Sequence, residues 1–111
     1  MSGLYNGPAV VQKITVTPQA EKINLGFKPG YVSIYNETNG VTVEWFSTMA
    51  SGESKKTIID GTVSKLSSGA ITINDGTDGL AKGITIPNNL VDINDAATEV
   101  LHVMIFREAK V

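Results

Sequence analysis

The sequence predicts a single all-β domain, an antiparallel β-sandwich of jelly-roll type or a small barrel, with a flexible N-terminal arm. Two observations carry this prediction. Apolar residues recur at every second position through most of the chain, which is typical of half-buried strands. Turn-forming residues interrupt this alternation about every ten positions, as they do in sandwiches and barrels. The length of 111 residues fits one domain.

The first nine residues lack the alternation and contain Gly3, Gly7 and Pro8. We therefore expect residues 1–9 to form the arm and residues 10–111 to form the β domain. The expected strands cover residues 10–17, 23–27, 31–36, 41–46, 57–59, 62–66, 70–74, 83–86 and 99–107, with a further short one at 91–93. No ten-residue stretch has helical periodicity, so no helix is expected.

The clearest local signal is a hairpin over residues 31–46. Tyr31 and Tyr35 lie on the same face of its first strand, because strand side chains alternate between two faces. Between the two strands stands Asn39-Gly40, the preferred dipeptide of a tight hairpin turn.

Two further segments carry expectations about packing. Lys28-Pro29-Gly30 predicts a turn, because proline presets φ and glycine permits positive φ. The last expected strand, residues 99–107, is apolar on both faces. Such a strand is usually central and covered on both sides, or it lies at a subunit interface.

Composition and charge exclude several classes of partner. The formal net charge is -2 and the sequence has no basic cluster, which argues against a nucleic acid or an anionic membrane surface as partner. No apolar run reaches the roughly 18 residues that a membrane helix needs. Charged residues make up 18%, below the roughly 25% of typical soluble domains, which favours burial against other proteins.

The absence of cysteine excludes disulfides, thiolate metal sites and cysteine nucleophiles. It also favours a cytosolic origin, because small secreted domains often depend on disulfides. The N-terminal residues have neither the basic start nor the apolar run of a signal peptide, and none is expected.

No residue pattern points to catalysis, to a metal or to a cofactor. His102 is the one histidine and stands within an apolar strand, so we expect it to be packed or at an interface. The serines lack a nucleophile motif, and no phosphate-binding loop is present. The run 74–79 fails the calcium-loop spacing and predicts a hairpin turn. A weak cation site formed with Asp92, Asn94 and Asp95 stays open.

Aromatic residues gather on the predicted hairpin, at Tyr31, Tyr35, Trp45 and Phe46. Such side chains can form a platform for sugars or single-stranded nucleic acid. Cross-strand packing or a subunit contact explains the cluster more simply, because opposite aromatic side chains stabilise antiparallel pairs.

Several motifs resemble those of small structural proteins of tailed-bacteriophage virions. They are Gly26-Phe27-x-Pro29-x-Tyr31-Val32-x-Ile34-x-Asn36-x-Thr38, Glu44-Trp45-Phe46 with Met49, Ser68-Gly69-x-Ile71-Thr72, Asn74-Asp75-Gly76-Thr77-Asp78-Gly79 with Gly83-Ile84-Thr85-Ile86, and Glu99-x-Leu101-His102. The resemblance covers about residues 25–106. It consists mainly of turn and core residues and therefore bears more on the fold than on the function.

The resemblance implies a head decoration (cement) protein, β-rich and often trimeric, made in the bacterial cytoplasm and bound to the outer surface of the head. Its partners would be the major capsid protein and further copies of itself, with no cofactor. An arm at residues 1–9 fits that plan. The residues expected to contact partners are Leu4, Tyr5, Pro8, Tyr31, Tyr35, Trp45 and Met49.

Two other functions compete with this one. The first is a tail fibre, spike or baseplate component that binds a host-surface glycan through exposed Tyr31, Tyr35 and Trp45. The second is a small enzyme, which the single histidine and the lack of a nucleophile motif argue against.

Overall fold

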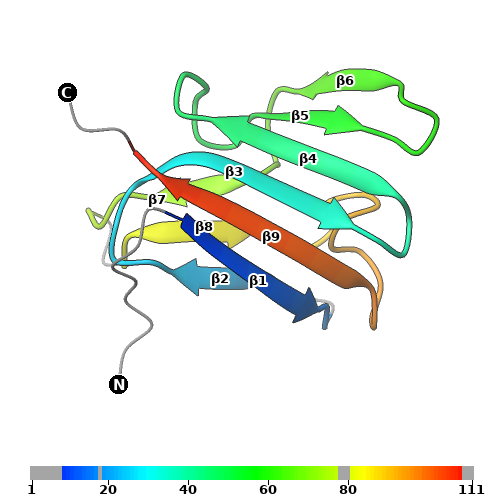
Figure 1. Ribbon diagram of the computed structural model, residues 1–111, viewed down its shortest axis with the longest axis horizontal. Helices are drawn as coiled ribbons and strands as arrows, with labels where there is room; N and C mark the ends of the chain where they lie inside the picture. The colour runs from blue at the N-terminus through cyan, green and yellow to red at the C-terminus, as the bar shows by residue number, and fades with distance from the viewer. Residues whose placement is uncertain (1–8, 18, 78–80, 109–111) are drawn as a thin grey trace.

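Two antiparallel β-sheets packed face to face make up the fold in a computed structural model that describes residues 9–17, 19–77 and 81–108 (Figure 1). The larger sheet has six strands in the order β1-β9-β3-β4-β5-β6, and the smaller has three in the order β2-β8-β7. The strands are β1 (Ala9–Thr15), β2 (Glu21–Asn24), β3 (Pro29–Asn36), β4 (Val41–Phe46), β5 (Ser54–Thr57), β6 (Val63–Leu66), β7 (Thr72–Asn74), β8 (Gly83–Ile86) and β9 (Val100–Arg107). The all-β prediction is confirmed, and the architecture is a two-layer sandwich.

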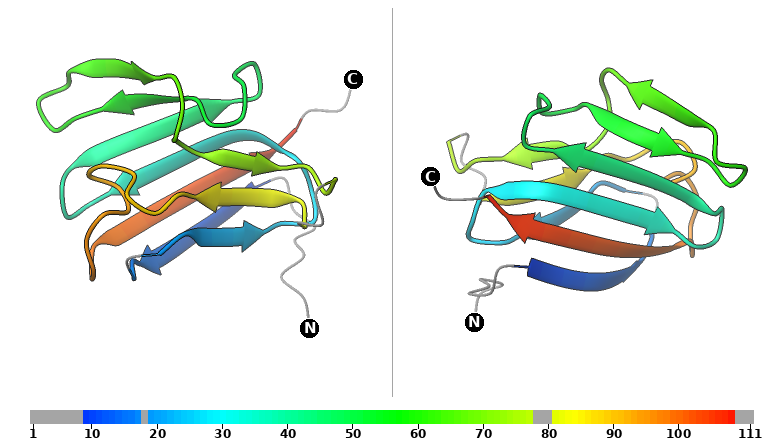
Figure 2. Two further views of the ribbon diagram at one scale, coloured as in Figure 1. Left: turned by 180° about the vertical axis from the view of Figure 1, so that it is seen from behind. Right: turned by 45° about the horizontal axis from the view of Figure 1, so that its top comes forward.

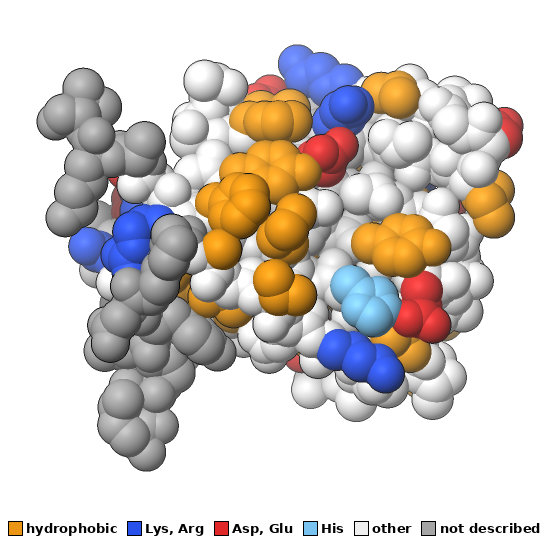
Figure 3. All heavy atoms as spheres, in the orientation of Figure 1, with side chains coloured by type: hydrophobic (Ala, Val, Ile, Leu, Met, Phe, Trp, Pro, Cys, Tyr) orange, Lys and Arg blue, Asp and Glu red, His pale blue; other side chains and the backbone are white. Residues whose placement is uncertain are grey.

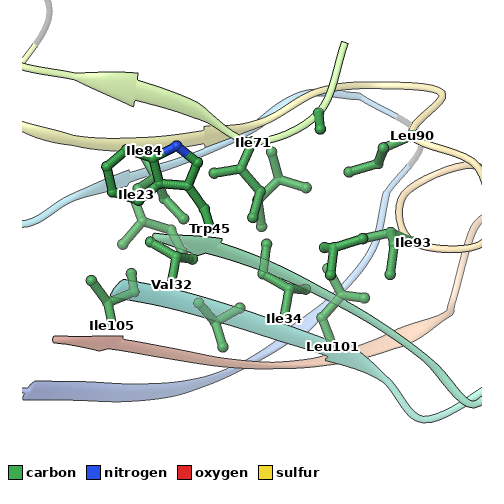
Figure 4. Close-up of a cluster of buried hydrophobic side chains, with 14 of the residues drawn as sticks. Ile23, Val32, Ile34, Trp45, Ile71, Ile84, Leu90, Ile93, Leu101 and Ile105 are labelled. Carbon is green, nitrogen blue, oxygen red and sulfur yellow. The ribbon is translucent and has the colours of Figure 1, made fainter. Parts of the chain in front are cut away.

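The core lies between the two sheets, and Figure 2 shows the smaller sheet covering one face of the larger one. The period-two alternation of the sequence decides which side chains enter it. Ile34 and Leu101 from the large sheet and Ile84 from the small sheet are fully buried, and their side chains point into the space between the two sheets (Figure 4). The other face of the large sheet carries the alternate residues of the same strands.

The predicted hairpin of β3 and β4 is confirmed, with Tyr31 opposite Phe46 and Asn36 opposite Val41. Its connection has the four residues 37–40 that the expected strand bounds left between the two strands. Gly40 takes a φ of 70° and donates its N–H to the carbonyl of Asn36 at 2.8 Å. Glycine adopts that left-handed conformation without the steric cost of a Cβ, which explains why it closes this turn.

The predicted turn at Lys28-Pro29-Gly30 is wrong, because β3 already begins at Pro29. Proline is tolerated at the first residue of a strand. The pairing of β3 with β9 shifts register between Pro29 and Tyr31. At Gly30, a Cβ would stand 2.9 Å from the Cα of Glu108, so this position needs glycine for close approach rather than for a turn.

The strand expected at residues 91–93 is also wrong, because this segment forms turns closed by one bridge between Leu90 and Asn94. Asn94 is fully buried, and its amide donates to the carbonyls of Gln19 (2.9 Å) and Pro87 (3.0 Å). These bonds satisfy backbone groups that no sheet ladder reaches. The Asn94 side chain, rather than pairing with a neighbouring strand, therefore holds this segment in place.

The expected arm falls mostly outside the described residues, which begin at Ala9. Ala9 was included in the arm by the sequence prediction, but it is the first residue of β1 and pairs with Phe106. Among the described residues no helix occurs, and none is therefore long and apolar enough to cross a membrane.

Candidate functional site

Exposed apolar side chains gather on the outward face of the six-stranded sheet, as Figure 3 shows. They come from alternate positions of β1, β3, β4 and β9, so they share the face opposite the core. We call this set the outer-face patch: Val11, Tyr31, Tyr35, Phe46, Met104 and Phe106. The exposed fraction is 77% for Val11, 44% for Phe106 and 43% for Tyr35, whereas the other three members are half-buried. The neighbours of Tyr35 on this face are Ser33, Thr42 and His102, so the other five residues make up the continuous apolar part. Contiguous apolar surface marks contact sites more often than lone exposed residues do.

Three aromatic rings form a row across β9, β3 and β4 at one end of the patch. The register places Phe106 of β9 and Phe46 of β4 on either side of Tyr31 in β3. The ring centroids of Tyr31 lie 5.3 Å from Phe46 and 5.9 Å from Phe106. Adjacent aromatic pairs at such distances stabilise a sheet face. Val11 and Met104, opposite each other in β1 and β9, extend the apolar surface along the strands.

Glu44 and Lys55 form a polar margin beside this row. The Tyr31 hydroxyl donates to Oε2 of Glu44 at 2.5 Å, and Nζ of Lys55 lies 3.8 Å from the other carboxylate oxygen. Burial raises the pKa of Tyr31 above its usual range, and the bond to the Glu44 carboxylate raises it further. The carboxylate is thus held by two groups of the same chain.

His102 forms a second polar margin, at the end of the face near the β3–β4 turn. Its Nε2 lies 2.5 Å from a carboxylate oxygen of Glu37, and its ring stacks on Tyr35 with centroids 6.2 Å apart. The side chain is 44% exposed. The packed alternative expected for this histidine is therefore wrong, because its side chain lies at the surface of the outer face. The interface alternative stays a prediction.

The two apolar faces of β9 have different surroundings. The strand is central, between β1 and β3, as its sequence indicated. Leu101, Val103 and Ile105 are buried against the small sheet. On the other face, Met104 and Phe106 have no further layer over them in the part of the chain that the structure describes. Within the described residues the strand is therefore covered on one face and not on both, and its position at a subunit interface stays a prediction.

A scan against protein-family models and searches of curated proteins and of solved structures found nothing that matches the chain.

The predicted contact residues are divided between the two sides of the sheet. Tyr31 and Tyr35 lie on the outer face, whereas Trp45 is in the core at 3% exposure and donates its indole N–H to the carbonyl of Ala50. Met49 packs partly buried against the core. Leu4, Tyr5 and Pro8 lie outside the described residues. Their roles as partner contacts stay predictions.

Two hollows meet at Met49, near the turn that follows β4. One, of about 320 Å³, is lined by Met49, Ser54, Lys55, Val63, Ser64 and Lys65. The other, of about 210 Å³, is lined by Lys28, Trp45, Ser47, Met49, Ser51, Ile73 and Asp75. Neither brings together a nucleophile and a histidine, since the only histidine lies on the outer face.

The residues of the possible cation site have other partners. Asp92 pairs with Lys56 at 3.5 Å, Asp95 accepts the backbone N–H of Asp92, and the Asn94 amide donates to backbone carbonyls. The described residues contain no group of three or more histidine, cysteine or acidic side chains placed to hold a metal ion.

The predicted contact residues did not include four members of the patch, Val11, Phe46, Met104 and Phe106, although Phe46 belongs to the aromatic cluster of the predicted hairpin. The signals for them were present in the sequence. Val10 and Val11 are adjacent apolar residues, so a strand through them has one apolar side chain on each face. The two-faced pattern of residues 99–107 carried the same information for Met104 and Phe106.

Proposed function

We propose that this chain is a non-enzymatic structural protein that acts by binding other proteins, and that it decorates the head of a tailed-bacteriophage virion. The observation that carries the protein-binding part is the outer-face patch on a sandwich whose other large apolar side chains are mostly packed in the core. The virion setting follows from the sequence resemblance over residues 25–106.

Such a role needs contact area and repetition rather than chemistry. A standard protein–protein interface buries about 1,600 Å² in total. Several such contacts made by one oligomer gain roughly 100-fold or more in avidity through effective concentration. A decoration protein of this kind would hold neighbouring capsid subunits together and resist their separation.

The arrangement of the aromatic rings favours a protein partner over a glycan. Sugar rings stack best on open aromatic faces that share a plane. Here the ring of Tyr31 is tilted by 57° to Phe46 and by 31° to Phe106. Trp45, which the glycan-binding alternative needs at the surface, lies in the core. The tail-fibre alternative therefore has less support.

The test is to mix the purified protein with capsids that lack it, sediment the particles and measure occupancy. We expect saturable binding at a fixed number of copies per capsid, and release of the packaged DNA at a higher temperature than for bare capsids. An unrelated acidic protein of similar size serves as the control. Particles that bind none of the protein, or that lose DNA at the same temperature with and without it, would contradict the proposal.

A further inference from the structure

We propose that the outer-face patch binds a second copy of this chain, outer face against outer face. The inference deepens the proposed function and rests on it only in treating the patch as a protein contact. It assigns the partner from three properties of the face: its charge, its area and its regular sheet geometry.

The charges around the patch suit a surface that meets its own copy. An identical surface must not present an unbalanced charge to itself, because like charges brought together cost free energy. Glu44 is held by Lys55 and the Tyr31 hydroxyl, and Glu37 is held against His102. Lys13 is exposed on the same face opposite His102, so the positive charges of Lys13 and Lys55 balance the negative charges of the two glutamates. Since the acidic groups at the margins already have partners within the chain, the centre is left apolar. A strongly charged partner would therefore find few unpaired charges on this face to bind.

The face is large enough for a stable dimer. The molecule measures 36 × 30 × 24 Å, and the six-stranded sheet lies across the two longer dimensions in the view of Figures 1 and 3. The outline of the whole molecule in this view, 36 × 30 Å, sets an upper limit of about 1,100 Å² on the area of the face. This limit exceeds the roughly 800 Å² per partner that a standard interface buries. The aromatic row of the patch lies toward one end of the strands, since Phe46 is the last residue of β4 and Phe106 the last but one of β9.

The outer face of the large sheet can pack against another sheet in the same way as its inner face packs against the small sheet. Two sheets pack face to face about 10 Å apart, with their apolar side chains interdigitated. The outer side chains of β3 and β9 are apolar at Tyr31, Met104 and Phe106, as the inner ones are. When a face packs against its identical copy, the contact is two-fold and closes as a dimer. The expected unit is thus a dimer rather than the trimer implied by the resemblance.

Thiol accessibility tests the occupant of the face directly, because the chain has no cysteine of its own. Val11→Cys places a thiol in the patch, and Ile59→Cys places one outside it, in the β5–β6 turn. Their side chains are matched in exposure, at 77% and 80%. In concentrated protein we expect the thiol at position 11 to react with a bulky maleimide at least 10-fold more slowly than the thiol at position 59. On dilution the two rates should converge.

Solution mass tests the same contact without a label. Light scattering should give twice the chain mass for the natural sequence and a single-chain mass for the double variant Val11→Lys with Phe106→Lys. Four lysines would then meet in one two-fold contact, and we expect a dissociation constant on the order of 100-fold weaker or more. The control is Ile59→Lys, which should stay dimeric. A coincident circular dichroism spectrum and thermal transition check that the double variant is folded.

The outcomes separate this inference from the proposed function. Equal reaction rates of the two cysteines at every concentration would overturn the self-contact. A double variant with the same solution mass as the natural sequence would also overturn it. Protection of position 11 that appears only when capsids are added also overturns it, and assigns the patch to the capsid. Failure of the protein to sediment with capsids, with the dimer intact, sinks the virion role and leaves the self-contact standing.

Discussion

At the scale of single residues, Tyr31 joins the apolar and polar parts of the outer face. Its ring lies between two phenylalanines, and its hydroxyl donates to the Glu44 carboxylate. A neutral hydroxyl can donate this bond, whereas a phenolate would stand beside a carboxylate in a partly buried site. Burial and Glu44 therefore both favour the protonated form and raise the pKa of Tyr31.

This raised pKa predicts a loss of stability at high pH. Between the unfolded tyrosine pKa of about 10 and the higher folded value, the unfolded chain releases a proton that the folded chain keeps. The contribution is thus complete below pH 10 and is lost as pH rises through the folded pKa. Denaturant titrations should show a steeper fall in the free energy of unfolding for the natural sequence than for Tyr31→Phe. Parallel slopes above pH 10 would contradict the assignment.

Asn94 is a second single residue with a structural role, because its side chain holds the segment between β8 and β9 in place. Its buried amide donates to three carbonyls, those of Gln19, Ile86 and Pro87. Alanine at this position leaves buried acceptors without a donor, which costs roughly 1–3 kcal/mol for each group that water cannot reach.

We expect Asn94→Ala to lower the free energy of unfolding by about 2 kcal/mol or more. The control is Asn88→Ala in the same segment, where the side chain is exposed and the change should stay within roughly 0.5 kcal/mol. Urea titrations followed by circular dichroism measure both. If the two substitutions cost the same, the amide bonds are not what holds this segment.

At the scale of elements, the small sheet depends on one close approach. β8 pairs with β2 on one side and β7 on the other, and Asn24 lies opposite Gly83 at the start of the strand. A Cβ built on Gly83 would overlap the carbonyl oxygen of Ile23. Backbone cannot give way here as a flexible side chain would, so β2 and β8 would have to separate.

Gly83→Ala should therefore destabilise the protein by about 3 kcal/mol or more, at the upper end of the cost of overpacking. Gly69→Ala is the matched control. Gly69 has a φ of 69°, but open space surrounds its Cβ position, so only the backbone strain of roughly 1–2 kcal/mol applies. Thermal unfolding of both variants distinguishes the causes, and a smaller loss for Gly83→Ala would show that the strands can part without cost.

At the scale of the whole molecule, the two sheets share one core. Ile34 from the large sheet and Ile84 from the small sheet are both fully buried in the same cluster. Neither sheet can keep its apolar face out of water alone, so the sandwich should unfold in one step. Trp45 reports on this process, because the single tryptophan of the chain lies in that core.

We expect the unfolding curves from Trp45 fluorescence and from circular dichroism to coincide. Ile34→Ala should shift both together, with a loss of about 2–5 kcal/mol, since it removes a buried side chain and leaves a cavity. A fluorescence transition that separates from the circular dichroism transition would mean that the sheets unfold independently.

The sequence by itself determined most of the strands and the two sides of each, but not the segment 91–93, which forms turns instead of the expected strand. Alternation at period two needs only neighbours along the chain, so it correctly separated Tyr31 and Tyr35 from Val32 and Ile34. It also marked residues 99–107 as apolar on both faces. The expected turn at Lys28-Pro29-Gly30 failed because its glycine serves a contact with Glu108, far away in sequence.

Only the tertiary structure decided which side of each strand faces the core and which strands share a face. The outer-face patch joins Val11, Phe46 and Phe106, which come from three strands and are brought together by the order β1-β9-β3-β4. The tertiary structure also places Trp45 in the core and Tyr31 and Tyr35 on the outer face, although all three residues lie in one hairpin. The physical reason is that strand order and sheet packing depend on long-range burial, whereas alternation is a local property of the backbone.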